Sequence, residues 1–367
     1  MRFFAIASVV VYHINEYVTR FGPVASSDQG MDWLIDAVCG QGFVGVHLFF
    51  AISGFILALP FAEHFLNSAP PVKLRRYFTR RVTRLEPPYL INLVVMYMVF
   101  SVAAGKATEM LPHLMGSAMY LHSLGFGERS AINGVAWSLE VEIQFYLLAP
   151  LLGWIYAIGS SMMRRVILVA AIVCLAVQDA TLTPPLDLTI LHHLQYFLVG
   201  FLLADCYLSE WRTNPDRSWR WDGVGTVAWF CIPLVVYHQF LTYELMPLLI
   251  FLAYGACMRG RVWPWIARQP ALVAIGGMCY TIYLYHFLCY WTVGAWSIRH
   301  TFTEIYWVNQ LLQITLLSAV TVVACSLLYL LFEKPFMRPD WPGRAWAMVR
   351  RGISGGVRID RTDPAGS

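Results

Sequence analysis

An arginine and a histidine near the N-terminus form the first pair of residues in the sequence that could do chemistry together. Arg2 and His13 lie in the apolar stretch MRFFAIASVVVYHINEY. On a helix, Arg2 and His13 would be separated by about 16 Å along the axis and by about 1,100° of rotation. Because this rotation is close to three full turns, both side chains would lie on nearly the same face. An imidazole can accept a proton from an attacking hydroxyl near neutral pH. From spacing alone, however, a packed histidine and an arginine that sets membrane topology are the favoured interpretation.

A basic segment, KLRRYFTRRVTR (73–84), is the second candidate. Arg81 and Arg84 are three residues apart, so on a helix they project from one face. Paired guanidinium groups suit bidentate recognition of phosphate. The alternative is that the segment marks the cytoplasmic side of a membrane and contacts anionic lipid, which alone explains most clusters of this kind.

Two glutamates open the segment WSLEVEIQFYLLAP (137–150). Ser138 can cap a helix here, and Glu140 and Glu142 then fall in its first turn, where the helix dipole favours carboxylates. Their spacing of two residues places them on different faces, so at most one of them points at any given site.

The segment YTIYLYHF (280–287) combines three tyrosines with His286. Tyrosines are common at membrane interfaces. His286 lies about fifteen residues into an apolar span and therefore near mid-depth, where an unpaired imidazole is costly. His192 and His193 are weaker candidates near the start of another span.

These residues must be positioned by membrane-spanning helices. The chain has 367 residues, of which 58% are hydrophobic and 13% are charged, against about 25% charged in soluble domains. Its apolar runs, such as 42–61 and 311–332, approach the roughly 20 residues that cross about 30 Å as a helix. Barrel strands would instead show short, alternating segments. The net charge of +4 argues against nucleic acid, and the cysteines have no metal-binding spacing, so we expect no metal.

We therefore predict an all-α, polytopic transmembrane bundle of about ten spans. Segment 110–124 is a weak candidate for a further span. The basic segment 73–84 and the later basic loops all lie on the cytoplasmic side only if 110–124 does not cross the membrane. Both termini are then cytoplasmic, and the acidic loop with Asp28, Asp32 and Asp36 is outside. One transmembrane domain is predicted for 1–338 and a disordered, basic, cytoplasmic tail for 339–367. The predicted spans are 3–21, 42–62, 87–105, 140–158, 166–178, 189–208, 223–241, 245–258, 271–296 and 305–332.

Several segments together resemble the acyltransferase-3 family of membrane acyltransferases. The similar segments, in the family's order, are RFFAIASVVVYH (2–13), FFAISGFIL (49–57), RRVTRLEPPYL (80–90), WSLEVEIQFYLLAPLL (137–152), YTIYLYHF (280–287) and FEKPF (332–336). Each match is weak by itself, but six in order across nearly the whole chain are specific. Departures are Glu140, where the family often has a small polar residue, and Cys279, which replaces a serine.

The resemblance implies a membrane-bound enzyme that moves an acyl group, typically acetyl, from acyl-CoA to a hydroxyl of a sugar, cell-surface glycan or secreted metabolite. It implies an integral protein of the bacterial inner membrane, surrounded by lipid. By matched position, His13 becomes the general base, and Glu142 orients the histidine or the substrate. The residues implied to contact the CoA phosphates are Arg2, Arg81 and Arg84. The residues implied to shape the substrate tunnel are Ser53, Trp137, Tyr280 and His286.

The alternative from another class is a transporter of a glycan or amphipathic metabolite without acyl-transfer activity. It shares the buried polar groups and the predicted spans. The six ordered segments favour the enzyme, and transfer from acyl-CoA by purified protein would discriminate between the two. A scaffold is the least favoured reading because it gives no reason for His13 and His286 inside spans.

Overall fold

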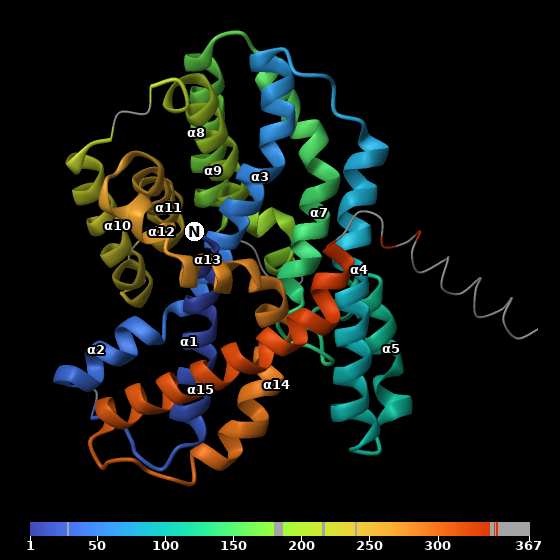
Figure 1. The fold of residues 1–367 in the computed structure, drawn as a ribbon, viewed down its shortest axis with the longest axis vertical. Helices are drawn as coiled ribbons and strands as arrows, with labels where there is room; N and C mark the ends of the chain where they lie inside the picture. The colour runs from blue at the N-terminus through green and yellow to red at the C-terminus, as the bar shows by residue number, and fades with distance from the viewer. Residues whose placement is uncertain are drawn as a thin grey trace, which may run out of the picture.

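The computed structural model describes residues 1–27, 29–179, 186–214, 217–238 and 241–337, together with Trp341 and Gly343. Within these residues the structure is helical and contains no strand, which confirms the all-α prediction (Figure 1). Asp28 and the predicted tail 339–367, except Trp341 and Gly343, lie outside the described residues.

The α-helices follow one another with short connections. In chain order they are α1 (Arg2–Phe21), α2 (Gly30–Cys39), α3 (Gly45–Asn67), α4 (Leu74–Tyr97), α5 (Ala107–Ala118), α6 (His122–Phe126), α7 (Trp137–Leu152), α8 (Ser161–Asp179), α9 (Ile190–Cys206), α10 (Trp219–Tyr237), α11 (Thr242–Arg259), α12 (Val262–Ala267), α13 (Pro270–Gly277), α14 (Cys279–Ser297) and α15 (Tyr306–Leu328). Short 3-10 or π turns are η1 (Gly42–Val44), η2 (Met98–Val102), η3 (Gly153–Ala157), η4 (Leu186–Leu188), η5 (Tyr207–Trp211), η6 (Tyr329–Glu333) and η7 (Lys334–Met337).

The backbones of helices α3 and α9 are in close contact in the core. A Cβ atom placed on Gly54 would lie 2.1 Å from the carbonyl oxygen of Phe197, and one placed on Gly200 would lie 2.2 Å from the amide nitrogen of Phe55. Small residues at such a seam allow helix backbones to approach where the apolar surroundings provide no hydrophobic driving force. The serine and glycine of the FFAISGF segment are therefore adjacent but have different tasks, because Gly54 packs on α9 while Ser53 faces a cavity.

A buried ion pair fastens α8 to α9. Arg164 Nε donates to Asp205 Oδ1 at 2.5 Å, and Arg165 Nε donates to Asp205 Oδ2 at 2.8 Å. The side chain of Asp205 is fully buried. Charges inside apolar surroundings are stable only when paired in this way.

The segment around residue 278 breaks one long apolar stretch into two helices. α13 and α14 are bent by 75° relative to each other. Glu333, which is buried, accepts hydrogen bonds from the backbone N–H of Thr281 at 3.0 Å and from its hydroxyl at 2.5 Å. The glutamate of the C-terminal FEKPF segment thus caps the start of α14, where the first backbone N–H groups have no partner within the helix.

Length and apolarity identify part of the predicted membrane topology. Five helical segments are long and apolar enough to cross a membrane, or up to six if the bent pair α13–α14 is one span. The protein is therefore described as an integral membrane protein, while the count of ten spans and the cytoplasmic termini stay predictions. The weak segment 110–124 falls in α5, of 12 residues, and α6, of 5 residues. Neither is long enough to cross about 30 Å of hydrocarbon.

Candidate active site

A cavity of about 860 Å³ opens between α3, α4, α7 and the α13–α14 break, with Arg2 of α1 at its edge. Figure 1 shows α7 lying between α3 and α4. The volume falls in the range of about 300 to 1,000 Å³ that is typical of small-molecule and cofactor sites. This cavity brings together residues that lie up to 331 positions apart, from Arg2 to Glu333.

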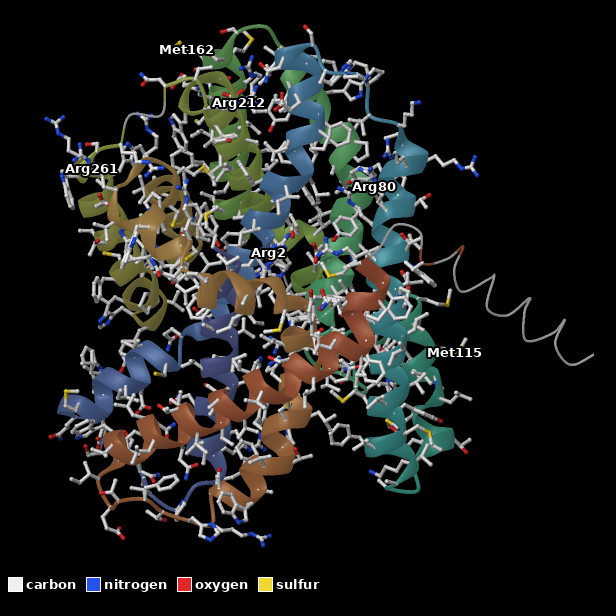
Figure 2. All side chains as sticks on the ribbon, in the orientation of Figure 1. Arg2, Arg80, Met115, Met162, Arg212 and Arg261 are labelled. Carbon is white, nitrogen blue, oxygen red and sulfur yellow. The ribbon has the colours of Figure 1, made fainter. Side chains whose placement is uncertain are left out.

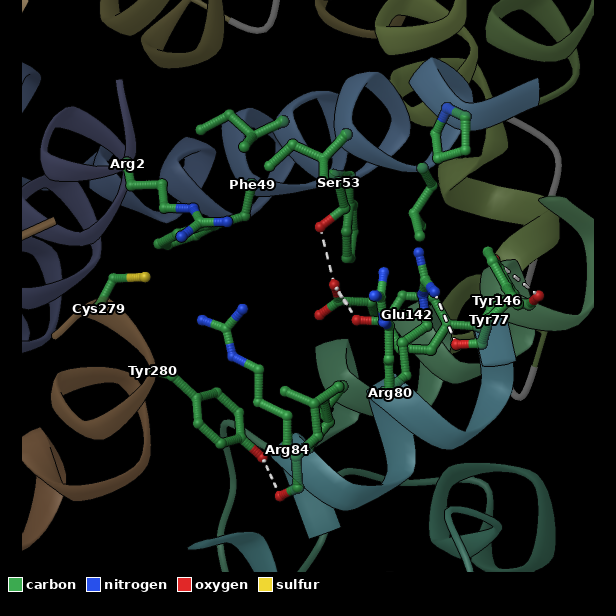
Figure 3. Close-up of a pocket in the computed structure, with 18 of the residues that line it drawn as sticks. Arg2, Phe49, Ser53, Tyr77, Arg80, Arg84, Glu142, Tyr146, Cys279 and Tyr280 are labelled. Carbon is green, nitrogen blue, oxygen red and sulfur yellow. Dashed lines mark hydrogen bonds between the residues drawn. The ribbon is translucent and has the colours of Figure 1, made fainter. Parts of the chain in front are cut away.

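Cationic side chains line the cavity from two directions. Arg76, Arg80 and Arg84 are four residues apart on α4 and thus share one face of that helix. Arg2 enters from α1, and Figure 3 shows it reaching into the cavity from the wall opposite Arg84. None of these four side chains makes an ion pair or hydrogen bond within the described part of the chain. With Lys73 at the same rim, they form a site able to bind a multiply charged phosphate compound.

Arg81 lines the same cavity, but its guanidinium is already engaged. Its Nη1 donates to the carbonyl oxygen of Tyr77 at 2.8 Å. The guanidinium carbon lies 3.6 Å from the ring centroid of Tyr77 and 5.5 Å from that of Tyr146. Cation–π contacts of this kind hold the side chain in place. Arg81 is thus a fixed part of the wall, unlike the arginines on the neighbouring face of α4.

Glu142 is the carboxylate that faces the cavity. The Ser53 hydroxyl donates to its Oε1 at 2.8 Å, and the Tyr146 hydroxyl donates to the same oxygen at 2.6 Å (Figure 3). Both donors fix the carboxylate, and Oε2 has no hydrogen-bond partner among the described residues. Two of the residues predicted from the sequence, Ser53 and Glu142, therefore meet directly.

Glu140 has a different place from Glu142. It is fully buried, does not line the cavity, and its Oε2 accepts the backbone N–H of Ser123 at 2.9 Å. Ser123 is the second residue of the short helix α6, so Glu140 caps that helix. The two glutamates do point in different directions, as their spacing requires.

Ser138, Tyr283 and Phe50 line the part of the cavity that adjoins the buried histidines His286 and His193, and we call these three residues the floor. The Tyr283 hydroxyl donates to the carbonyl oxygen of Val135 at 2.5 Å and lies 3.1 Å from Ser138 Oγ. Tyr280 lines the cavity beside the floor, and its hydroxyl donates to the carbonyl oxygen of Leu85 at 3.0 Å. This last bond joins α14 to α4 next to Arg84.

His13 does not line the cavity. Its Nδ1 lies 3.7 Å from Glu16 Oε2, and its ring contacts that of His286 at 5.3 Å between centroids. The side chain of His13 is 16% exposed, whereas His286 is completely buried. Both histidines lie behind the floor, since His286 Nδ1 bonds to the carbonyl oxygen of the floor residue Tyr283 at 2.9 Å.

The hydrogen bonds of His286 define its tautomer. Nδ1 contacts the carbonyl oxygens of Ile282 and Tyr283, each at 2.9 Å. Carbonyl oxygens only accept, so Nδ1 carries the proton and Nε2 of the neutral ring is unprotonated. Nε2 is buried and has no partner among the described residues. The ring therefore presents a hydrogen-bond acceptor next to His13.

The residues predicted from the sequence thus divide into two groups. Those on the cavity are Arg2, Ser53, Arg81, Arg84, Glu142 and Tyr280. Those behind its floor are His13, His286 and Trp137, which is partly buried and packs 6.4 Å from the Phe50 ring. The sequence interpretation missed Arg76 and Arg80 as cavity residues, although their four-residue spacing with Arg84 was a readable signal. It also missed Glu16, three residues after His13, and the buried cap made by Glu333.

Comparison with known proteins identifies the class to which this helical protein belongs. The model of the acyltransferase-3 family, described as an acyltransferase domain, matches residues 1–330. The chain therefore belongs to that family of acyltransferases, which confirms the resemblance drawn from its six ordered segments.

Three relatives illustrate the similarity. A Bacillus subtilis protein named "Putative peptidoglycan O-acetyltransferase YrhL" is 27% identical over 202 residues, which are 50% of this chain and 28% of that protein. "Nodulation protein 10" of Rhizobium leguminosarum bv. viciae is 24% identical over 375 residues, 92% of each chain. A Staphylococcus aureus protein named "Putative O-acetyltransferase SACOL0978" is 21% identical over 380 residues, 94% of this chain and 58% of that protein. This chain thus spans well under two thirds of the Bacillus and staphylococcal relatives. No solved structure matches the chain.

Proposed function

We propose that this acyltransferase moves an acyl group, acetyl in the simplest case, from acyl-CoA to a hydroxyl of a sugar, cell-surface glycan or secreted metabolite. The observation that carries the proposal is the cavity of about 860 Å³ and its five cationic lining residues, which are Arg2, Lys73, Arg76, Arg80 and Arg84. CoA carries phosphate groups at one end and a thioester at the other. Unpaired guanidinium groups are well suited to the phosphates.

The donor is proposed to enter with its phosphates on Arg2 and Arg84 and on the rim cations. Arg81 supports this site indirectly, because its contacts with Tyr77 and Tyr146 hold the wall beside Glu142. The free oxygen of Glu142 is positioned to accept an amide N–H of the pantetheine arm. The thioester would then lie against the floor made by Ser138, Tyr283 and Phe50.

Catalysis is assigned to His13 on the other side of that floor. Nε2 of His13 takes the proton of the acceptor hydroxyl while the hydroxyl oxygen attacks the thioester carbonyl carbon. The carbon–sulfur bond breaks as the new ester forms, and the CoA thiolate leaves with the proton that His13 received. Glu16 is proposed as a positioning residue, because its carboxylate, 3.7 Å from Nδ1, favours the ring orientation with Nε2 free.

The floor is the barrier that this mechanism must cross. Ser138 and Tyr283 are in contact at 3.1 Å, and Tyr283 in turn contacts His286, the neighbour of His13. The acyl end of the donor must pass between these two side chains to reach the base. No metal takes part in the proposed reaction.

The proposal includes the orientation derived from loop charges. The chain forms a single acyltransferase domain with about ten spans and both termini in the cytoplasm, in a bacterial inner membrane. Arginines and CoA are then on the cytoplasmic side. His13 and the acceptor are on the side toward the outer surface. Two relatives whose names specify O-acetyl transfer support the acyl group, and the name of the Bacillus protein supports a glycan acceptor.

The test is transfer of radiolabelled acetyl from acetyl-CoA by the purified protein in liposomes. We expect label to appear in an acceptor glycan and to depend on His13. A transporter would instead move the glycan across the membrane without transferring label. Turnover retained by His13→Ala would remove His13 as the base.

A further inference from the structure

His193, in the first turn of α9, is a buried histidine that the proposed reaction does not use. It is 3% exposed, and neither of its ring nitrogens has a hydrogen-bond partner in the part of the chain that the structure describes. Leaving a buried polar group unsatisfied costs about 1 to 3 kcal/mol, so such groups are rare in native structures. Two unsatisfied nitrogens on one ring indicate a place for a hydrogen-bonding ligand.

Aromatic rings surround His193. Its ring centroid lies 5.2 Å from that of Trp137, 5.1 Å from that of Phe50 and 5.7 Å from that of His47. The Nδ1 atom of His47 is also buried without a partner among the described residues. We call Trp137, His193, His47 and Arg129 the Trp137 cluster. Arg129 is exposed, and its guanidinium carbon lies 5.4 Å from the ring centroid of Trp137.

Three helices begin at this cluster. Trp137 is the first residue of α7, His47 lies in the first turn of α3 and His193 lies in the first turn of α9. The ring contacts through His193 bring these three starts together. Helix N-termini carry partial positive charge, which favours electron-rich oxygen atoms nearby.

The cluster adjoins both halves of the proposed active site. Phe50 belongs to the floor and contacts His193, and Trp137 directly precedes the floor residue Ser138. Arg129, which is exposed, adds a positive charge beside the Trp137 ring. Rings also lead from His13 through Tyr12 and Phe43 to His47, at 4.8, 5.7 and 6.2 Å between successive centroids.

We infer that the Trp137 cluster is the acceptor-binding subsite and that it takes a neutral saccharide ring. A neutral imidazole offers one donor and one acceptor, which matches the hydroxyl groups of a sugar. The indole of Trp137 supplies an apolar face for the carbon-bound hydrogens of the ring. Arg129 and Glu16 carry opposite charges, so their charges together favour a neutral acceptor over a charged one. No set of three metal-ligating side chains occurs among the described residues, so a metal does not explain the unpaired nitrogens.

This inference rests on the proposed function, since it names the acceptor class of that same site. It separates the roles of the two groups of rings. His13 takes the proton, whereas Trp137 and His193 hold the sugar whose hydroxyl is acylated.

The experiment measures sugar binding and acetyl transfer separately, with tetra-N-acetylchitotetraose as the probe. Binding is followed by saturation-transfer NMR on the protein in nanodiscs, and acetyl-CoA binding by calorimetry. Trp137→Leu and His193→Ala should remove the sugar signal and raise KM for the sugar at least about tenfold, which is about 1.4 kcal/mol. The dissociation constant of acetyl-CoA should stay unchanged, which also shows that the variants fold. Trp154→Leu and His300→Ala are the matched controls, because both residues are exposed and lie outside the cluster.

The outcomes distinguish this inference from the proposed function. Sugar binding that depends on Trp137 without acetyl transfer would overturn the proposed function and keep the subsite. Acetyl transfer whose KM for the sugar is the same in His193→Ala and wild type would overturn the subsite and keep the function. A wild-type protein that neither binds the probe nor acetylates it contradicts the saccharide assignment. His193→Asn, which retains one donor and one acceptor, should restore part of the sugar signal.

Discussion

The cavity and the region behind its floor use polar side chains in opposite ways. On the cavity side, Arg76, Arg80 and Arg84 are exposed, charged and unpaired within the described residues. Figure 2 labels Arg80 on α4. Behind the floor, His13, His286 and His193 are largely or fully buried, and their contacts are mostly with other rings. Full charges attract an anion from water, whereas neutral rings in apolar surroundings can move or share protons. The comparison teaches that donor binding and proton transfer can be altered independently.

The largest expected effect separates the two regions at His13. His13→Ala should lower kcat by about 10²- to 10⁴-fold, the usual contribution of a general base. The dissociation constant of acetyl-CoA should not change, because His13 does not line the cavity. The rate of acetyl transfer and the dissociation constant of acetyl-CoA, measured by calorimetry on the same preparation, test the two expectations. A parallel loss of CoA binding would show that the two regions are not independent.

The next effect lies on the cavity side. Arg84→Gln should weaken acetyl-CoA binding about 10- to 100-fold, since a hydrogen bond to a charged group contributes about 1.5 to 3 kcal/mol. Arg81→Gln is the comparison on the same helix. Its guanidinium is already held by Tyr77 and Tyr146, so the substitution should mainly lower the melting temperature. Equal losses of affinity in the two variants would contradict the distinction between free and engaged arginines.

The two glutamates of α7 provide a third contrast. Glu140→Ala should lower the free energy of unfolding by about 1 to 3 kcal/mol, because it leaves the buried N–H of Ser123 unpaired. Glu142→Ala should leave stability nearly unchanged, since Ser53 and Tyr146 can turn their hydroxyls toward the cavity. It should instead raise the dissociation constant of acetyl-CoA several-fold. Thermal unfolding measures the stability of both variants, and calorimetric titration measures their affinity for acetyl-CoA. A loss of stability in Glu142→Ala and a loss of affinity in Glu140→Ala would contradict the two roles.

The smallest expected effect refines the region behind the floor. Glu16→Gln should reduce kcat by about two- to fivefold, the scale of a partly exposed ion pair. KM for both substrates should remain the same, because Glu16 acts through the orientation of His13. Glu109→Gln, on α5, serves as a control for the loss of one exposed carboxylate. A change in the KM for acetyl-CoA in Glu16→Gln would place Glu16 in the donor site instead.

Much of the fold was predictable because it follows from composition and order. Long apolar runs predicted helices, and six ordered segments predicted the family that the family model then confirmed. The separation of Glu140 from Glu142 also followed from helical periodicity. The spacing could not say which glutamate faces a cavity, because that depends on α6 lying against one face of α7.

The division between the cavity and the region behind its floor could not be read from the sequence. Arg2 and His13 share one helix face, yet the floor residues Ser138 and Tyr283 come from α7 and α14 and lie between the cavity and the histidines. The subsite around His193 was equally hidden, because its three rings come from the separate helices α3, α7 and α9. Such sites arise from tertiary contacts among residues more than 50 positions apart, where single-sequence spacing carries no signal.

The glycine seam between α3 and α9 has a mechanical consequence. Since the two backbones touch at Gly54 and Gly200, these helices cannot slide or separate without losing contact along their length. We therefore expect the two helices to move as one unit, of which α3 lines the cavity. We expect a passage for the acyl arm to open between α7 and α14 instead, where the Tyr283 hydroxyl would have to leave both Ser138 Oγ and the carbonyl oxygen of Val135.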